Sequence, residues 1–211
     1  MNTRRNLLLG AGAAALGLLT WRAAPSRSAA TATGDGDALL PNTTVLAHDG
    51  RAYRFYDDLV RDKVVAINMM YVQCSGVCPA MTANLRRVQQ MLGQRLGRDV
   101  YMYSITLRPE QDRPQSLAAY AGLYRIEPDS GWLFLTGEPA ELLSLRRQIG
   151  FFDPDPLVDG DTASHTGAVR IGNDRFRRWT MAPALAEPGQ IVATLNHVDD
   201  RMQHTAHRAA T

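Results

Sequence analysis

The chain has little cysteine, no sustained excess of one charge and no long hydrophobic run. Only two of its 211 residues are cysteines, Cys74 and Cys78. The net charge is +2, and residues 1–30 hold four arginines and no acidic residue, so subtracting those four charges leaves −2 for the remainder. That remainder lacks the basic footprint that nucleic-acid binding requires, which excludes this class of partner.

The amino terminus carries a short apolar segment behind two adjacent arginines. Arg4 and Arg5 precede the small, apolar residues 10–20, a stretch shorter than the roughly 18 to 20 residues that cross a bilayer. This pattern is typical of a twin-arginine export signal. We therefore expect residues 1–30 to direct export to the periplasm. An uncleaved signal that anchors the chain to the inner membrane is the alternative.

The part after this signal has the size and composition of one globular domain. Residues 31–38 are rich in Gly, Ala, Asp and Thr and are predicted to be a flexible leader. Residues 39–203 then form the domain, without internal repeats, and residues 204–211 form a tail. In an oxidising compartment the two cysteines of this domain can form a disulfide.

The spacing of apolar residues predicts alternating strands and helices. Strands are expected at 42–47, 51–55, 64–71, 100–107, 132–135, 167–171 and 175–181. Helices are expected at 81–92, 113–124, 138–149 and 188–202. The first two strands flank an Asp-Gly turn and should form an N-terminal β-hairpin. This order predicts an α/β protein with a central mixed sheet flanked by helices, and a cysteine pair after the first core strand favours the thioredoxin fold.

The two cysteines lie where the apolar run 64–71 gives way to a helical stretch. A helix N-terminus favours thiolates, because its free N–H groups and dipole attract negative charge. The spacing of Cys74 and Cys78 is close to one helical turn, so the two sulfurs can either form a bridge or bind one soft metal ion. A permanent disulfide across so small a loop removes little chain entropy. The sequence thus favours redox or metal chemistry over a structural role.

Several segments resemble the Sco/SenC family of exported copper proteins. The matching segments are Cys74-Ser75-Gly76-Val77-Cys78-Pro79, Arg108-Pro109-Glu110-Gln111-Asp112 and the lone His165 before the 167–171 strand. The resemblance implies copper, as Cu(I) or Cu(II), bound by Cys74, Cys78 and His165. It also implies a metallochaperone without turnover of its own, which supplies copper or reducing thiols to the dinuclear copper centre of cytochrome c oxidase. The partner would be the copper-bearing subunit of that oxidase or another copper- or thiol-exchange protein.

Two positions depart from the family pattern. Ser164 stands where the family often has an acid beside its histidine, and Arg108 stands where the family commonly has Asp, which leaves Asp112 as the matching acid. A periplasmic thiol-disulfide oxidoreductase, a thiol peroxidase and a redox or copper sensor are the alternative functions. Typical oxidoreductases space their cysteines by two residues, so the wider spacer and His165 favour metal binding.

Overall fold

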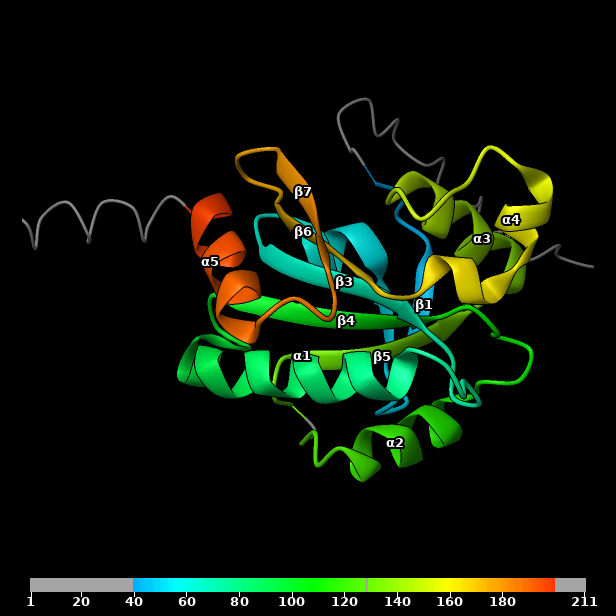
Figure 1. Ribbon diagram of the computed structural model, residues 1–211, viewed down its shortest axis with the longest axis horizontal. Coiled ribbons are helices and arrows are strands. Elements are labelled where there is room, and N and C mark those ends of the chain that lie inside the picture. The colour runs from blue at the N-terminus through cyan, green and yellow to red at the C-terminus, as the bar shows by residue number, and fades with distance from the viewer. Residues whose placement is uncertain (1–39, 128, 200–211) are drawn as a thin grey trace, which may run out of the picture. The chain divides into compact units, whose positions relative to one another are not determined.

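The computed structural model describes residues 40–127 and 129–199 (Figure 1). The expected signal at 1–30, the leader at 31–38 and the tail at 204–211 lie outside these residues. Within the described ranges, no helix combines the length and the apolar character that crossing a bilayer requires.

A seven-stranded mixed sheet forms the centre of the domain, in the order β2-β1-β5-β4-β3-β6-β7. The strands are β1 Thr44–Ala47, β2 Ala52–Arg54, β3 Val64–Met70, β4 Val100–Thr106, β5 Trp132–Gly137, β6 Ala168–Asn173 and β7 Arg178–Pro183. Strands β3, β4 and β5 pair in parallel, whereas β1 pairs with β5 and β6 pairs with β3 in the antiparallel sense. The sheet is therefore mixed, and the N-terminal hairpin β1-β2 extends one edge of it, as the sequence predicts.

Helices cover both faces of this sheet (Figure 1). They are α1 Cys78–Leu92, α2 Pro114–Leu123, α3 Pro139–Gln148, α4 Pro156–Gly160 and α5 Pro188–Val198. One core cluster joins the sheet to α1, α2 and α5, and a second joins its other face to α3 and the π-helical turn Phe55–Val60. Each α-helix has a proline in its first turn. Backbone N–H groups there have no hydrogen-bond partner within the helix, so a proline costs no hydrogen bond.

Strand β3 lies inside the sheet, between β4 and β6, and this position explains its almost continuous apolar run. All of its residues are buried, because β4 and β6 flank it and helices cover both faces. The chain leaves β3 at its carboxyl end and enters α1 after a short loop. With helices on both faces of a parallel β3-β4-β5 core, the predicted thioredoxin-like α/β fold is confirmed.

Several boundaries differ from the sequence prediction. Helix α1 begins at Cys78 rather than near residue 81. The β6-β7 turn lies at 174–177 instead of 172–174, because β6 continues to Asn173, which pairs with Val64. The Asn173 side-chain amide also donates 3.0 Å to the Val198 carbonyl, which fixes this strand end against α5. Helix α5 ends at Val198, short of the expected residue 202.

Candidate functional site

The two cysteines lie together at the carboxyl end of β3. Cys74 is in the loop between β3 and α1, and Cys78 is the first residue of α1. Cys74 is 9% exposed and Cys78 is fully buried. Both are free thiols, and the Cys78 thiol donates a hydrogen bond to the Cys74 sulfur. The structure therefore shows a reduced dithiol with one sulfur nearer to solvent than the other.

The surroundings of the two thiols separate their acidities. Burial acts to raise the pKa of Cys74, but hydrogen bonds from the Cys78 thiol and from the backbone N–H groups of Cys78 and Gly76 outweigh it and lower the pKa. Burial, together with donation to Cys74, raises the pKa of Cys78 to about 12. Cys74 is thus the more acidic thiol of the pair, and Cys78 is the hydrogen-bond donor that stabilises its deprotonated form.

This asymmetry predicts that alkylation of the reduced protein has one fast phase. We expect Cys74 to react first, with a pH midpoint below the ordinary thiol value of about 8.5, because its thiolate forms at lower pH. Stopped-flow alkylation across pH, with mass spectrometry to locate the adduct, measures this. A Cys74→Ser variant should lack the fast phase. Equal rates for both thiols, with a midpoint above about 8.5, contradict the prediction.

Tyr71 and Arg108 connect the cysteine loop to the segment that bears His165. The Tyr71 hydroxyl is hydrogen-bonded to Cys74, and this bond and burial raise the pKa of Tyr71. The Arg108 guanidinium lies 4.1 Å from the centre of the Tyr71 ring, a cation-π arrangement. Its Nη2 also donates 3.3 Å to Oγ1 of Thr162, which opens the 3₁₀ turn Thr162–His165. The departure at Arg108 thus places a permanent positive charge beside the ring that contacts Cys74.

Asp112 supports the cysteine loop through two hydrogen bonds. Its carboxylate is buried, and Oδ2 accepts a 2.5 Å hydrogen bond from the Thr106 hydroxyl at the end of β4. The same oxygen accepts a 3.0 Å bond from the Val72 N–H, two residues before Cys74. The acid of the 108–112 segment therefore ties the end of β4 to the start of the cysteine loop.

His165 is buried and bonded to a different set of residues. It ends the 3₁₀ turn Thr162–His165 and is 6% exposed. Its Nε2 atom contacts Nη1 of Arg146 and lies 2.9 Å from the Asp159 carbonyl oxygen and 3.4 Å from Asp159 Oδ1. The structure thus brings Cys74 and Cys78 together but directs the His165 imidazole toward Arg146 and Asp159.

Of the three copper ligands that the resemblance implies, the structure brings together only the two cysteines. Among residues 40–127 and 129–199, no three His, Cys, Asp or Glu side chains lie close enough together to hold a metal ion. The two thiols fit the preference of copper for soft sulfur donors. The backbone just after His165 adjoins the end of the cysteine loop, since a Cβ added to Gly167 would lie 4.0 Å from the Val77 side chain. His165 as the third ligand stays a prediction that requires its imidazole to turn.

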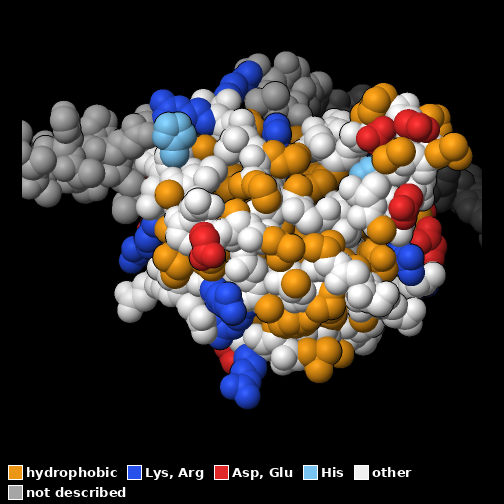
Figure 2. All heavy atoms as spheres, in the orientation of Figure 1, with side chains coloured by type: hydrophobic (Ala, Val, Ile, Leu, Met, Phe, Trp, Pro, Cys, Tyr) orange, Lys and Arg blue, Asp and Glu red, His pale blue; other side chains and the backbone are white. Residues whose placement is uncertain are grey.

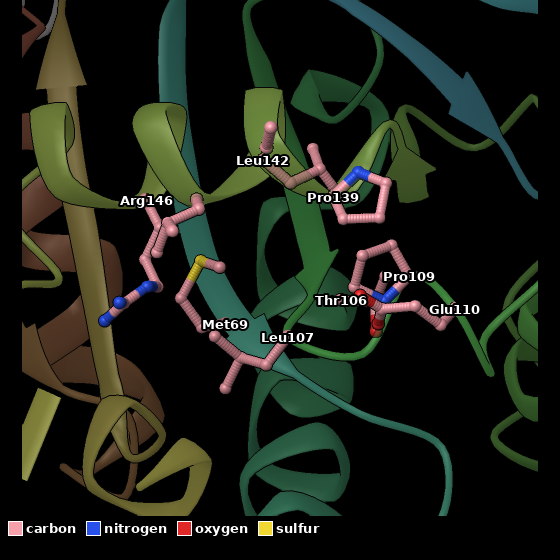
Figure 3. Close-up of a pocket in the computed structure, with 10 residues that line it drawn as sticks. Met69, Thr106, Leu107, Pro109, Glu110, Pro139, Leu142 and Arg146 are labelled. Carbon is pink, nitrogen blue, oxygen red and sulfur yellow. The ribbon is translucent and has the colours of Figure 1, made fainter. Parts of the chain in front are cut away.

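A hollow of about 290 Å³ opens beside this region, between the ends of β3 and β4 and helix α3 (Figure 3). Met69, Leu107, Pro109, Pro139 and Leu142 make its wall largely apolar. Figure 3 shows Arg146 at its margin, on the side away from Pro109 and Glu110. Neither thiol lines the hollow, so it is a neighbour of the site and not the site itself.

Sequence reasoning missed Arg146, Asp159 and Tyr71. Arg146 lies on α3, 19 residues before His165, and Asp159 lies on α4, six residues before it. No spacing rule predicts a contact among residues on three separate elements. Tyr71 was a visible neighbour of the cysteines, but its contact with Cys74 depends on the path of the loop. The charge of Arg146 near the end of α3 is the only sequence signal, and it indicates a helix C-terminus rather than a site.

Comparison with known proteins gives a consistent result. A family model described as SCO1/SenC matches residues 37–199. A protein of Stutzerimonas stutzeri, provisionally named as copper-binding, is 30% identical over 103 residues, which is 48% of each chain. The SCO1 protein homolog of Bacillus subtilis is 32% identical over 78 residues, or 37% of this chain and 39% of the relative. The chain thus matches less than half the length of these curated relatives.

Solved structures share the fold. The structure of Bradyrhizobium japonicum ScoI with copper bound superposes with a TM-score of 0.58 at 21% identity. The match covers 76% of this chain and 99% of that one. At this level of identity the similarity shows the arrangement of strands and helices, which agrees with the sheet order described above.

Proposed function

Because the chain belongs to the SCO1/SenC family, we propose that it carries copper as cargo and that Cys74 and Cys78 supply its sulfur donors. The observation that supports this most directly is the reduced pair of thiols, which share a hydrogen bond at the carboxyl end of β3. Two sulfurs held together by a loop and a helix N-terminus suit a soft ion. His165 is the proposed third donor.

The two thiols have different tasks in this proposal. Cys74 is the more acidic and the more exposed, so it is the sulfur that meets incoming copper or a partner first. Cys78 keeps its proton in the absence of metal, because burial raises its pKa. Binding through both sulfurs therefore displaces a proton from Cys78. Release of the cargo returns that proton and restores the hydrogen-bonded dithiol.

The proposal includes a location and a recipient. Residues 1–30 would export the chain to the periplasm, where copper centres of respiratory enzymes are accessible. The recipient would be the copper-bearing subunit of cytochrome c oxidase, or another protein that exchanges copper or thiols. Membrane contact would then come from that partner or from an uncleaved signal.

A copper titration of reduced and oxidised protein tests the proposal. We expect the reduced chain to take up about one copper ion and the disulfide form to take up none, because oxidation consumes both sulfur donors. Anaerobic titration with a chromophoric competitor gives the stoichiometry, and absorption or X-ray spectroscopy identifies sulfur ligation. Equal uptake by the reduced and oxidised forms contradicts the proposal.

Thiol-disulfide exchange is the second candidate, and the unequal acidity of the two thiols supports it. In that reaction the Cys74 thiolate attacks one sulfur of a partner disulfide, and Cys78 then attacks Cys74 in the mixed disulfide. The partner leaves as a dithiol, and Cys74 and Cys78 are left oxidised. The same titration separates the two functions, because an oxidoreductase of this kind needs both thiols but no copper.

A further inference from the structure

Arg146, Asp159 and His165 form a buried polar cluster on the side of the domain where α3 and α4 lie. Each is less than 10% exposed. Two large apolar side chains of the segment around them are exposed: Phe152 is 53% and Leu157 is 86% exposed. Figure 2 shows acidic side chains gathered on this flank. Asp159 is the acid that points inward, and the Arg146 guanidinium holds its pKa far below the ordinary range.

The contacts at Arg146 Nη1 are in competition. This atom lies 2.8 Å from Asp159 Oδ1 and 3.0 Å from the Phe151 carbonyl, and it also contacts Nε2 of His165. A guanidinium nitrogen of this type has two protons and no lone pair, so the three acceptors exceed its donors. Nε2 either accepts a hydrogen bond from Arg146 or donates one to the Asp159 carbonyl oxygen at 2.9 Å. In both tautomers Nε2 is engaged and faces a permanent cation.

A metal ion cannot share this position. Copper bound at Nε2 would need the lone pair that Arg146 contacts, and it would place a second cation beside a guanidinium that never loses its charge. Asp159 does not offset this repulsion, because it already pairs with Arg146 at 2.8 Å and with Arg147 at 2.9 Å. His165 therefore has to leave Arg146 before its Nε2 reaches the thiols. A cavity of about 160 Å³ borders the imidazole.

We propose that Arg146 is a positioning residue that competes with copper for His165 and so lowers the affinity of the site. This inference rests on the proposed function. While Arg146 contacts His165 Nε2, the protein offers copper two sulfurs. When this contact is broken, the protein offers two sulfurs and a nitrogen. Arg146 thereby makes copper easier to release, a property that a carrier of cargo needs.

The test compares Arg146→Gln with Arg147→Gln by copper competition titration of the reduced full chain. Arg146→Gln should bind copper about 10- to 100-fold more tightly, the range for a lost charge-assisted hydrogen bond or an altered partner of a ligand. Asp159 keeps Arg147 and the Asp153 N–H as partners in this variant. Arg147→Gln, which removes an exposed partner of the same carboxylate without touching His165, should bind like the unmodified chain.

A second pair of variants tests whether any gain in copper affinity depends on the His165 imidazole. In a His165→Ala background, adding Arg146→Gln should leave copper affinity unchanged, because the contact under test is already absent. The nitrogen signature in copper spectroscopy should strengthen in Arg146→Gln and be lost with His165→Ala. If Arg146→Gln does not fold, Arg146→Lys replaces it, with an intermediate gain expected because Lys lacks the planar fork of donors.

The outcomes separate this inference from the proposed function. If the unmodified chain binds copper and Arg146→Gln binds equally or more weakly, the proposed competition between Arg146 and copper is overturned and the copper function stands. If the gain persists without His165, Arg146 acts by charge alone and the positioning role is overturned. If the unmodified reduced chain binds no copper, the proposed function fails and this inference fails with it.

Discussion

A Cys78→Ser variant is expected to bind copper more than about 100-fold more weakly than the unmodified chain. Outer partners of metal ligands contribute about 10- to 100-fold, so the loss of a ligand itself should exceed this range. A serine hydroxyl is a hard, neutral donor that does not replace a thiolate for a soft ion. Cys78 is also fully buried at the start of α1, so water cannot readily take its place.

Competition titration of reduced protein against a chelator measures this loss. Ser75→Ala is the matched control, because it changes an exposed residue of the same loop and leaves both sulfurs in place. The folded state of each variant is checked by its free energy of unfolding. A Cys78→Ser protein that keeps copper affinity within tenfold of the unmodified chain would remove Cys78 from the ligand set.

Replacing Asp112 with alanine is expected to lower the free energy of unfolding by about 2–4 kcal/mol, because two hydrogen-bond donors lose their acceptor. These donors are the Thr106 hydroxyl, which is buried, and the Val72 N–H, which is partly buried. The substitution should also loosen the loop that leads to Cys74 and slow the binding of copper by Cys74 and Cys78. Denaturant unfolding and the rate of copper uptake measure the two effects.

Asp112→Asn is the control for shape. Its amide oxygen has two lone pairs and can still accept both hydrogen bonds without the charge, so it should lose less stability than alanine. An equal loss in asparagine and in alanine would indicate that the charge of Asp112, rather than its role as acceptor, supports the loop. An Asp112→Ala protein that unfolds at the same denaturant concentration as the unmodified chain contradicts the assigned role.

Much of the fold was predictable because its signals are local. The almost continuously apolar β3 indicates burial on both faces, and first-turn prolines mark the starts of the helices. The turn between β6 and β7 was misplaced because its position depends on the pairing of Asn173 with Val64 across the sheet, which has no local signal. The π-helical turn Phe55–Val60 was missed for the same reason: its apolar residues pack on a distant part of the core.

The sequence alone determined the sulfur half of the candidate site. Cys74 and Cys78 are four positions apart at a strand-to-helix junction, so chain geometry by itself brings them together. The environment of His165 was decided only by the tertiary structure, since Arg146 and Asp159 reach it from two other helices. A buried imidazole takes whichever partners the packed elements present, and that competition depends on distances in space that spacing along the chain does not encode.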